Sequence, residues 1–105
     1  MVTYGVDTFK AIADPTRRAV LDYLLEAPHG VNELAGKFDI SRPAISKHLR
    51  ILLRAQLVQA RWEGRERIYA INPAPLAEVD QWLQEYRTAL RHALRRLKAH
   101  IESNR

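Results

Sequence analysis

The side chains best suited to chemistry in this 105-residue chain lie between positions 41 and 54. Residues that the apolar pattern leaves free recur there at steps of three or four, and they are Arg42, Pro43, Ser46, Lys47, Arg50 and Arg54. Such steps place them along one outer face of a helix. Because Lys and Arg bind phosphates or guanine edges and Ser can bind either, the segment could bind nucleic acid.

A basic stripe on an amphipathic helix is often only a solvated surface, so the distribution of charge bears on the choice. Residues 37–67 contain eight Lys or Arg and three acidic residues, a net charge of +5. The whole chain, with 17 basic and 12 acidic residues, also carries a net charge of +5. The rest of the chain therefore has equal numbers of basic and acidic residues. A charge excess confined to one presumed surface indicates a polyanionic partner.

The basic helix must be positioned by a small core, and residues 31–55 have the pattern of a helix-turn-helix. Leu34, Ala35 and Phe38 form one apolar stripe and Ile40 closes the turn. A second stripe comprises Ile45, Leu49, Leu52 and Leu53. Ser41 can cap the second helix and Pro43 suits its first turn, so this helix is predicted to begin at Arg42. Asn32 is the expected cap of the first helix.

Two further elements flank this motif. A short helix over residues 6–13 ends at Asp14-Pro15, where a second helix begins and runs to about Ala27, before Pro28-His29-Gly30. Alternation over residues 58–63 and 66–71, around Gly64-Arg65, predicts a β-hairpin within a wing over residues 58–71. Its register would pair Val58 with Ile71, Ala60 with Tyr69 and Trp62 with Arg67, which gives one largely apolar face.

A hairpin directly after a recognition helix is the wing of a winged helix. Its tip could place Arg65 beside the DNA backbone or in the minor groove, with Arg61 and Arg67 as further candidates. The alternative is a plain edge hairpin that its arginines keep soluble. The predicted fold class is therefore mainly α with a small β-hairpin, in one domain over residues 1–105.

The last segment, residues 75–101, is predicted as one long helix with Leu76, Leu83, Leu90 and Leu97 in heptad spacing. At 1.5 Å per residue it is about 40 Å long, whereas the rest of the chain has a radius of gyration of about 11 Å. A second copy could cover the helix. The sequence thus predicts a homodimer whose interface comprises Val6, Phe9, Leu76, Val79, Leu83, Tyr86, Leu90, Leu94 and Leu97.

Two alternatives stand beside this interface. The stripe could pack only on its own domain, and Tyr4, Trp62, Trp82 and Tyr86 could line a small pocket near the interface or belong to the core. A dimer would present two recognition helices to half-sites about 34 Å apart.

Composition excludes several function classes. Because the chain has no cysteine, it can have neither thiolate catalysis nor thiolate metal sites. It also contains no glycine-rich phosphate loop and no acid–base pair, so the sequence does not indicate an enzyme or a cofactor. No run of apolar residues is long enough to span a membrane and no leader begins the chain, so we expect a cytoplasmic protein without a membrane partner. His92 and His100 lie eight residues apart, but we expect no metal site there.

Several motifs together resemble the arsenical-resistance regulator (ArsR) family of winged-helix repressors, in its cysteine-free, autorepressor-like branch. They are FKAIADPTRR at residues 9–18, ELA at 33–35, SRPAISKHL at 41–49, EGR at 63–65 and Tyr69. The resemblance implies a dimer that represses transcription at a palindromic operator. It also implies major-groove positions for Ser41, Arg42, Pro43, Ser46, Lys47 and His48, and wing-tip positions for Gly64 and Arg65. His48 could instead pack under its helix.

The chain departs from the family pattern where many members sense metals. Residues 33–38 lack the cysteine pair of those members. On the last helix, Trp82 stands where a histidine follows the Asp at position 80 in other members. Arg95 and Arg96 follow His92, where a carboxylate ligand would be needed. Asp39 replaces a common glycine, but Asp tolerates left-handed geometry. We therefore predict a repressor that binds double-stranded DNA, with no metal and with the inducing ligand left open. The alternatives are a winged-helix protein-interaction module and a metal-responsive repressor that uses the histidines of its last helix.

Overall fold

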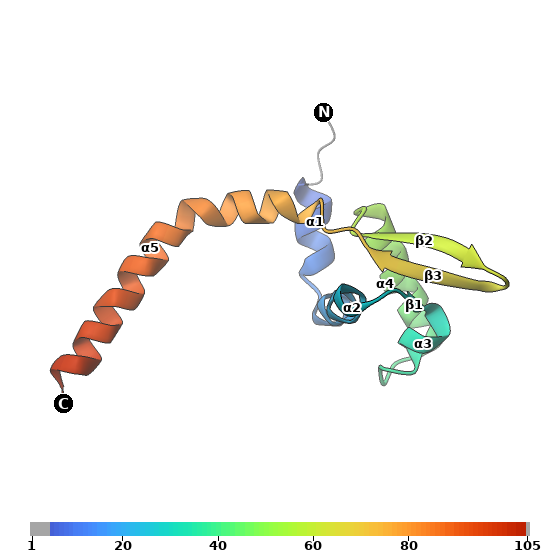
Figure 1. Cartoon of the computed structure of the whole chain (residues 1–105), viewed down its shortest axis with the longest axis horizontal. Coiled ribbons are helices and arrows are strands. Elements are labelled where there is room, and N and C mark those ends of the chain that lie inside the picture. Colours follow the sequence, from blue (N-terminus) through green and yellow to red (C-terminus); the bar gives the residue numbers. More distant parts are fainter. Residues whose placement is uncertain (1–4, 105) are drawn as a thin grey trace.

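A computed structural model describes residues 5–104, with side chains from Asp7 onward. In chain order its elements are α1 (Gly5–Ile12), α2 (Pro15–Glu26), β1 (His29–Gly30), α3 (Val31–Ala35), α4 (Arg42–Arg54), β2 (Val58–Glu63), β3 (Glu66–Ile71) and α5 (Leu76–Ser103) (Figure 1). The expected fold class, mainly α with a β-hairpin and a long C-terminal helix, is confirmed. Tyr4 and the side chain of Val6, which entered the predictions above, lie outside the described residues.

The core forms where α2, α3 and α4 meet the sheet. Its fully buried side chains include Val20, Leu24, Leu34, Ile45, Leu49, Leu52 and Leu57. Each such side chain contributes about 1.5–3 kcal/mol by leaving water. Because three of them lie on α4, one side of that helix is fixed against the core and the opposite side faces outward.

Side-chain caps set where two helices begin. Asp14 Oδ2 accepts a hydrogen bond from Arg17 N at 3.0 Å, and Ser41 Oγ accepts one from Ala44 N at 3.2 Å. The predicted start of α4 at Arg42 is thus confirmed. The cap expected at Asn32 is wrong: β1 continues directly into α3, so Gly30 is the N-cap and makes no side-chain hydrogen bond there.

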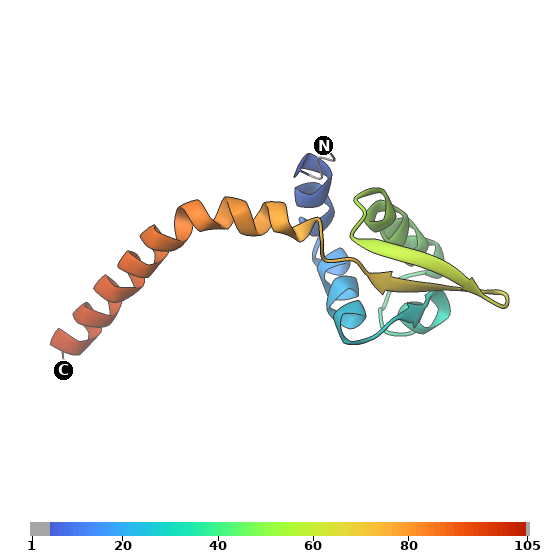
Figure 2. The same ribbon diagram turned by 45° about the horizontal axis from the view of Figure 1, so that its top comes forward.

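The sheet has the order β1-β3-β2 and is antiparallel throughout. The register of the hairpin is confirmed, with Val58 opposite Ile71, Ala60 opposite Tyr69 and Trp62 opposite Arg67. Gly64 has a φ of +63°, which suits a tight hairpin turn with glycine first. The tip of the hairpin and the far end of α5 lie at opposite ends of the molecule (Figures 1 and 2).

The strand β1 (His29–Gly30) is not among the predicted elements, because the sequence of residues 28–30 indicates only the end of a helix. His29 pairs with Tyr69 and Gly30 with Ile68, which adds a third strand at the edge of the hairpin. Two residues are too few to produce an alternating pattern, so the sequence carried no periodic signal for this strand.

The connections around α4 differ from expectation at two positions. Ile40 does not close the turn by burial, since 40% of its surface is exposed. Asp39 does not use left-handed geometry; among the described non-glycine residues, Gln56 does, with a φ of 60°. Gln56 N donates to Leu53 O and Leu57 N to Leu52 O, both at 3.0 Å, which ends α4 in a Schellman motif.

The helix α5 projects from the rest of the molecule, and the whole molecule has principal extents of 61 × 38 × 20 Å. Only its start contacts the domain. Leu76, which is partly buried, packs on the core where α5 joins the domain. Phe9 of α1 meets Trp82 edge to face at a centroid distance of 5.6 Å, and Trp82 packs on Tyr86 at 5.0 Å. The alternative in which the apolar stripe of α5 packs only on its own domain is therefore wrong for the part of the stripe beyond Tyr86, where the apolar side chains are exposed.

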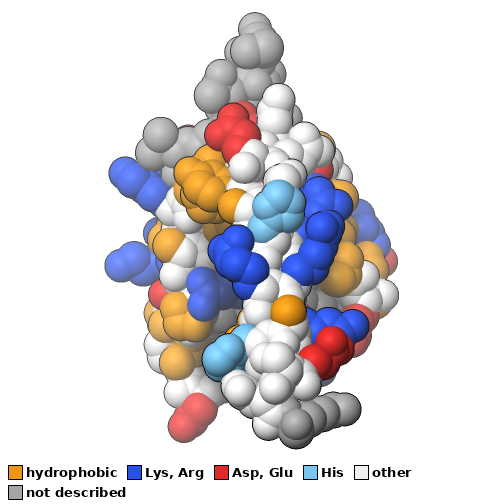
Figure 3. All heavy atoms as spheres, turned by 90° about the vertical axis from the view of Figure 1, so that its left-hand side faces the viewer, with side chains coloured by type: hydrophobic (Ala, Val, Ile, Leu, Met, Phe, Trp, Pro, Cys, Tyr) orange, Lys and Arg blue, Asp and Glu red, His pale blue; other side chains and the backbone are white. Residues whose placement is uncertain are grey.

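The small pocket predicted between aromatic side chains does not form among those that the structure describes, which are Trp62, Trp82 and Tyr86. Trp62 lies on the hairpin strand β2, whereas Trp82 and Tyr86 lie on α5, and all three are about half exposed or more. The alternative that these aromatic side chains belong to the core is wrong for the same reason. Figure 3, which looks onto the side where α5 projects, shows Lys, Arg and His side chains beside exposed hydrophobic ones.

Candidate nucleic-acid interface

The outward side of α4 carries four basic side chains, all exposed to solvent: Arg42, Lys47, Arg50 and Arg54. None of them forms an ion pair or a hydrogen bond with another described residue. Ser41 and Pro43 at the start of the helix are also exposed, and Ser46 is half-buried. The structure therefore brings together seven of the predicted site residues on one helix, whose other side is anchored in the core.

His48 lies on α4 but turns toward α2, with 20% of its side chain exposed. Its Nδ1 lies 3.2 Å from Arg17 Nη1 and 3.9 Å from Asp14 Oδ2. A guanidinium group only donates hydrogen bonds, so Nδ1 must accept and the neutral ring carries its proton on Nε2. Of the two interpretations of His48, the geometry fits packing under the helix.

Arg17 is a residue that the sequence reasoning missed. Its Nε donates to Ala11 O at 2.7 Å and its Nη2 to Lys10 O at 3.1 Å, so it caps carbonyl groups at the end of α1. Together with its contact to His48, these bonds tie α1, α2 and α4 to one another. The available signal was its place three residues after Asp14, in the first turn of α2.

Asp14 completes this cluster as the N-cap of α2. The backbone N–H of Arg17 holds the pKa of the Asp14 carboxyl below the ordinary value of 3.8, and the positive charge of Arg17 acts in the same direction. Burial acts in the opposite direction but is outweighed. Asp14 is therefore ionised near neutral pH, which suits its position at the positive end of α2.

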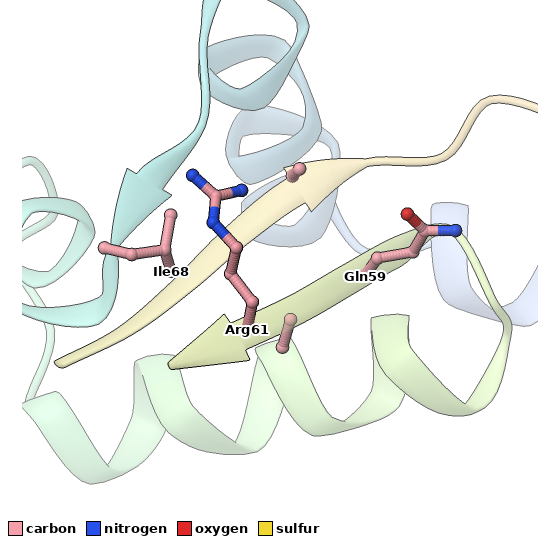
Figure 4. Close-up of a pocket in the computed structure, with 5 residues that line it drawn as sticks. Gln59, Arg61 and Ile68 are labelled. Carbon is pink, nitrogen blue, oxygen red and sulfur yellow. The ribbon is translucent and has the colours of Figure 1, made fainter. Parts of the chain in front are cut away.

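The hairpin presents its arginines in three directions. Arg65 is exposed at the tip beside Gly64. Arg61 stands opposite Ile68, on the outer face of the sheet, and Arg67 stands opposite Trp62, on the inner face. Figure 4 shows Arg61, Gln59 and Ile68 around a shallow hollow of about 130 Å³, and Arg61 Nη2 lies 3.5 Å from Glu63 Oε2.

The inner face of the hairpin is apolar only over the core. Val58 and Tyr69 are buried there, but 65% of the surface of Trp62 is exposed nearer the tip. Arg67 lies over this ring, with its Cζ 5.5 Å from the ring centroid. The prediction of one apolar face thus holds for the half of the hairpin that contacts the core and fails toward the turn, where no helix lies beneath.

The part of the chain that the structure describes gathers no group of three or more His, Cys, Asp or Glu that could hold a metal ion. On α5, Asp80 forms an ion pair with Arg87, and His100 Nε2 lies 3.1 Å from Asn104 Nδ2. His92 and His100 are thus not assembled with carboxylates. No helix among the described residues is long and apolar enough to cross a membrane.

Comparison with known proteins agrees with this architecture. Residues 14–60 match the model of the bacterial regulatory protein, arsR family. The chain is similar to the HTH-type transcriptional regulator Rv2034 of Mycobacterium tuberculosis, with 41% identity over 80 residues that cover 76% of this chain and 75% of that protein. It is also similar to the transcriptional repressor SdpR of Bacillus subtilis, at 36% identity over 80 residues, 76% of this chain and 89% of SdpR.

Among solved structures, an ArsR-like transcriptional regulator from Rhodococcus sp. RHA1 superimposes with a TM-score of 0.73 and 31% identity. The match covers 95% of this chain and 92% of that one. The likeness therefore extends beyond the helix-turn-helix to the wing and the last helix. The chain belongs to the ArsR family of bacterial regulatory proteins, winged-helix transcriptional regulators that are not enzymes.

Proposed function

We propose that this protein is a homodimeric transcriptional repressor that binds an inverted repeat in double-stranded DNA. In each protomer α4 enters the major groove and the hairpin lies against the neighbouring backbone as a wing. Residues 31–55 form the helix-turn-helix, residues 58–71 the wing, and residues 75–101 the dimerisation helix, which the N-terminal helix at 6–13 joins. The relatives that are named repressors support the regulatory direction.

The observation that carries the proposal is the row of four cations on α4 without a counter-ion among the described residues. Elsewhere in the chain, Arg61, Arg87 and Lys98 each lie within 4 Å of a carboxylate. Leaving four charges unpaired on one helix face produces a local positive potential that attracts phosphate. Ser41, Ser46 and the cations would supply the groove and phosphate contacts, and Gly64 and Arg65 the wing contact.

A second copy of the chain is the partner that α5 fits best. Large apolar side chains from Leu83 to Ile101 are between 39% and 57% exposed, and they form one continuous stripe. An exposed apolar stripe of this length marks an interaction surface. Phe9 of α1, also 36% exposed, extends the same surface through its contact with Trp82.

The spacing of this stripe suggests how the two helices pair. Its members stand symmetrically about Leu90: Tyr86 and Leu94 four residues away, Leu83 and Leu97 seven, and Val79 and Ile101 eleven. In a two-fold interface the same surface meets itself, so residue i contacts residue j and j contacts i. An antiparallel pairing centred on Leu90 satisfies this condition with every apolar side chain opposite another.

The function is tested by selecting bound duplexes from a random DNA pool and measuring affinity for the selected sequence by fluorescence anisotropy. An inverted repeat is the expected product. Replacing Arg42 or Lys47 by alanine should weaken binding by about 1–3 kcal/mol for a base contact. Arg95→Ala, which removes an exposed charge from α5, is the matched control.

Equal affinity of the parent, Arg42→Ala and Lys47→Ala proteins would overturn the placement of α4 in the groove. A protein-interaction module that reuses this fold makes a different prediction. It would select no sequence from the pool, and the purified chain would sediment as a monomer at micromolar concentration. We also propose that the repressor acts in the cytoplasm, where bacterial DNA is located.

A further inference from the structure

The inner face of the wing carries a stack of three side chains that the proposed function does not yet use. Arg67 of β3 lies with its Cζ 5.5 Å from the ring centroid of Trp62 and 6.0 Å from that of Tyr69. Trp62 stands directly across the hairpin from Arg67, and Tyr69 follows it on the same face. A guanidinium group over aromatic faces is attracted to them, which restricts its movement. We call these three residues the wing stack.

Arg67 is held by the wing stack but is not neutralised. Its Nε is buried and has no hydrogen-bond partner, and the described residues offer it no ion pair. The carboxylate of Glu63 lies beside Arg61 on the other face. That of Glu66 reaches to Gly30, where it fills the space that a Cβ would occupy.

A buried donor without an acceptor is unfavourable. The folded wing therefore maintains a cation that has no counter-ion among the described residues. A ligand that brings negative charge and acceptor oxygens to the terminal guanidinium nitrogens would provide the missing counter-ion.

The position of the wing stack indicates which ligand that is. It shares its face of the hairpin with Val58 and Ala60, which pack on the core beside α4. Nearer the tip, Trp62 extends past this core and is 65% exposed. The stack thus lies on the side of the wing that turns toward the recognition helix, where a duplex engaged by α4 would pass.

We propose that Arg67 binds a phosphate of the DNA backbone, and that Trp62 and Tyr69 are positioning residues that restrict the movement of its guanidinium group. This inference rests on the proposed function and adds a contact to it. A phosphate accepts two parallel hydrogen bonds from one guanidinium group, which matches a group of restricted movement with free donors. Because phosphates are the same in every sequence, the contact contributes affinity without base specificity.

The salt dependence of binding tests the phosphate contact. Anisotropy titrations from about 50 to 200 mM salt use two duplexes, the selected inverted repeat and one of random sequence. Arg67→Gln should lower the slope of log affinity against log salt by about 0.9 for each wing that binds. It should weaken both duplexes by the same factor. Arg95→Gln, the charge-matched control on α5, should leave the slope unchanged.

Tryptophan variants test the positioning role. Trp62→Ala should weaken binding several-fold because the guanidinium loses its platform, and Trp62→Phe, which keeps an aromatic ring, should restore most of the affinity. Binding of DNA to the parent should change tryptophan emission, and this change should be absent from Trp62→Phe. Thermal unfolding of each variant shows whether its fold is intact.

The outcomes separate this inference from the function on which it rests. If the parent binds neither duplex, the proposed function itself fails. If the parent binds and a folded Arg67→Gln protein keeps the full salt slope, the phosphate contact is overturned alone. Loss confined to the selected duplex would also overturn it, because that result indicates a base contact.

Discussion

Arginine side chains in this protein differ in their roles according to what each one contacts. The guanidinium group of Arg17 donates hydrogen bonds to carbonyl groups of α1 and to His48, so this residue links α1, α2 and α4. Arg61 lies beside a carboxylate on the outer face of the sheet. Arg42 and Arg50 meet no described partner and face solvent. Residue type alone could not separate these roles, because the separation depends on which strand face or helix side each position occupies.

Asp14 is the residue whose protonation should matter most directly for stability. Its pKa is lowered in the folded state, so its carboxylate stabilises the fold at pH values above its unfolded pKa. This contribution is lost as the pH falls through the lowered pKa of the folded state. Asp14→Ala should cost about 1 kcal/mol at neutral pH through loss of the cap. Urea unfolding measures this cost.

The pH dependence separates the charge of Asp14 from its capping. Asp14→Asn keeps a capping oxygen but does not titrate, so its difference in stability from the parent should shrink as the pH falls below about 4. Asp39→Asn, which changes an exposed carboxylate that accepts no hydrogen bond within residues 5–104, serves as the control. A constant difference between Asp14→Asn and the parent across the acid range would contradict this account.

At the scale of elements, the strength of a periodic pattern decided what the sequence could predict. The hairpin register and the start of α4 were correct because alternation and a Ser-x-Pro start are both local signals. The strand β1 spans two residues and depends on β3, which lies about 40 positions away in the chain, so no local pattern could reveal it. The cap at Gly30 was missed for the same reason, since β1 decides where α3 begins.

The helix α5 carries a prediction about its pairing register. Over the stripe from Leu83 to Ile101, five steps cover 18 residues, or 3.6 residues per step, which keeps the stripe straight along one face. If the pairing is antiparallel about Leu90, this residue meets its own copy. Since the chain has no cysteine, Leu90→Cys introduces a single thiol, which should form a disulfide-linked dimer under mild oxidation.

Single cysteines elsewhere on the stripe test the direction of pairing. Leu83→Cys alone should not cross-link, but a mixture of Leu83→Cys and Leu97→Cys proteins should, because these positions face each other only between different chains. Non-reducing gel electrophoresis gives the result directly. A parallel pairing would instead cross-link every single variant with itself, and that pattern would refute the register.

At the scale of the whole molecule, the core leaves two separate surfaces uncovered, the basic side of α4 and the apolar stripe of α5. The core holds α4 and the hairpin at one end of the molecule, and α5 extends from the other end, so that the whole molecule is 61 Å long. The domain can thus fold around its own core while the apolar stripe of α5 remains available to a partner. Stability of the core and strength of pairing should respond to different substitutions.

The spacing of the operator half-sites should therefore matter only when α5 can pair. Two recognition helices held by one dimer reach half-sites on the same face of the duplex, about one helical turn of 34 Å apart. Inserting about five base pairs between the half-sites turns one of them to the opposite face, so the parent should bind this duplex no better than a single half-site. Restoring a full turn by a second such insertion should not restore affinity fully, because the centres are then too far apart. Leu90→Glu, which places a charge at the centre of the stripe, should yield a folded monomer with the same weak affinity for all of these duplexes. Anisotropy and sedimentation measure both properties, and a Leu90→Glu protein that still distinguishes the spacings would show that the two helices are held together by some surface other than α5.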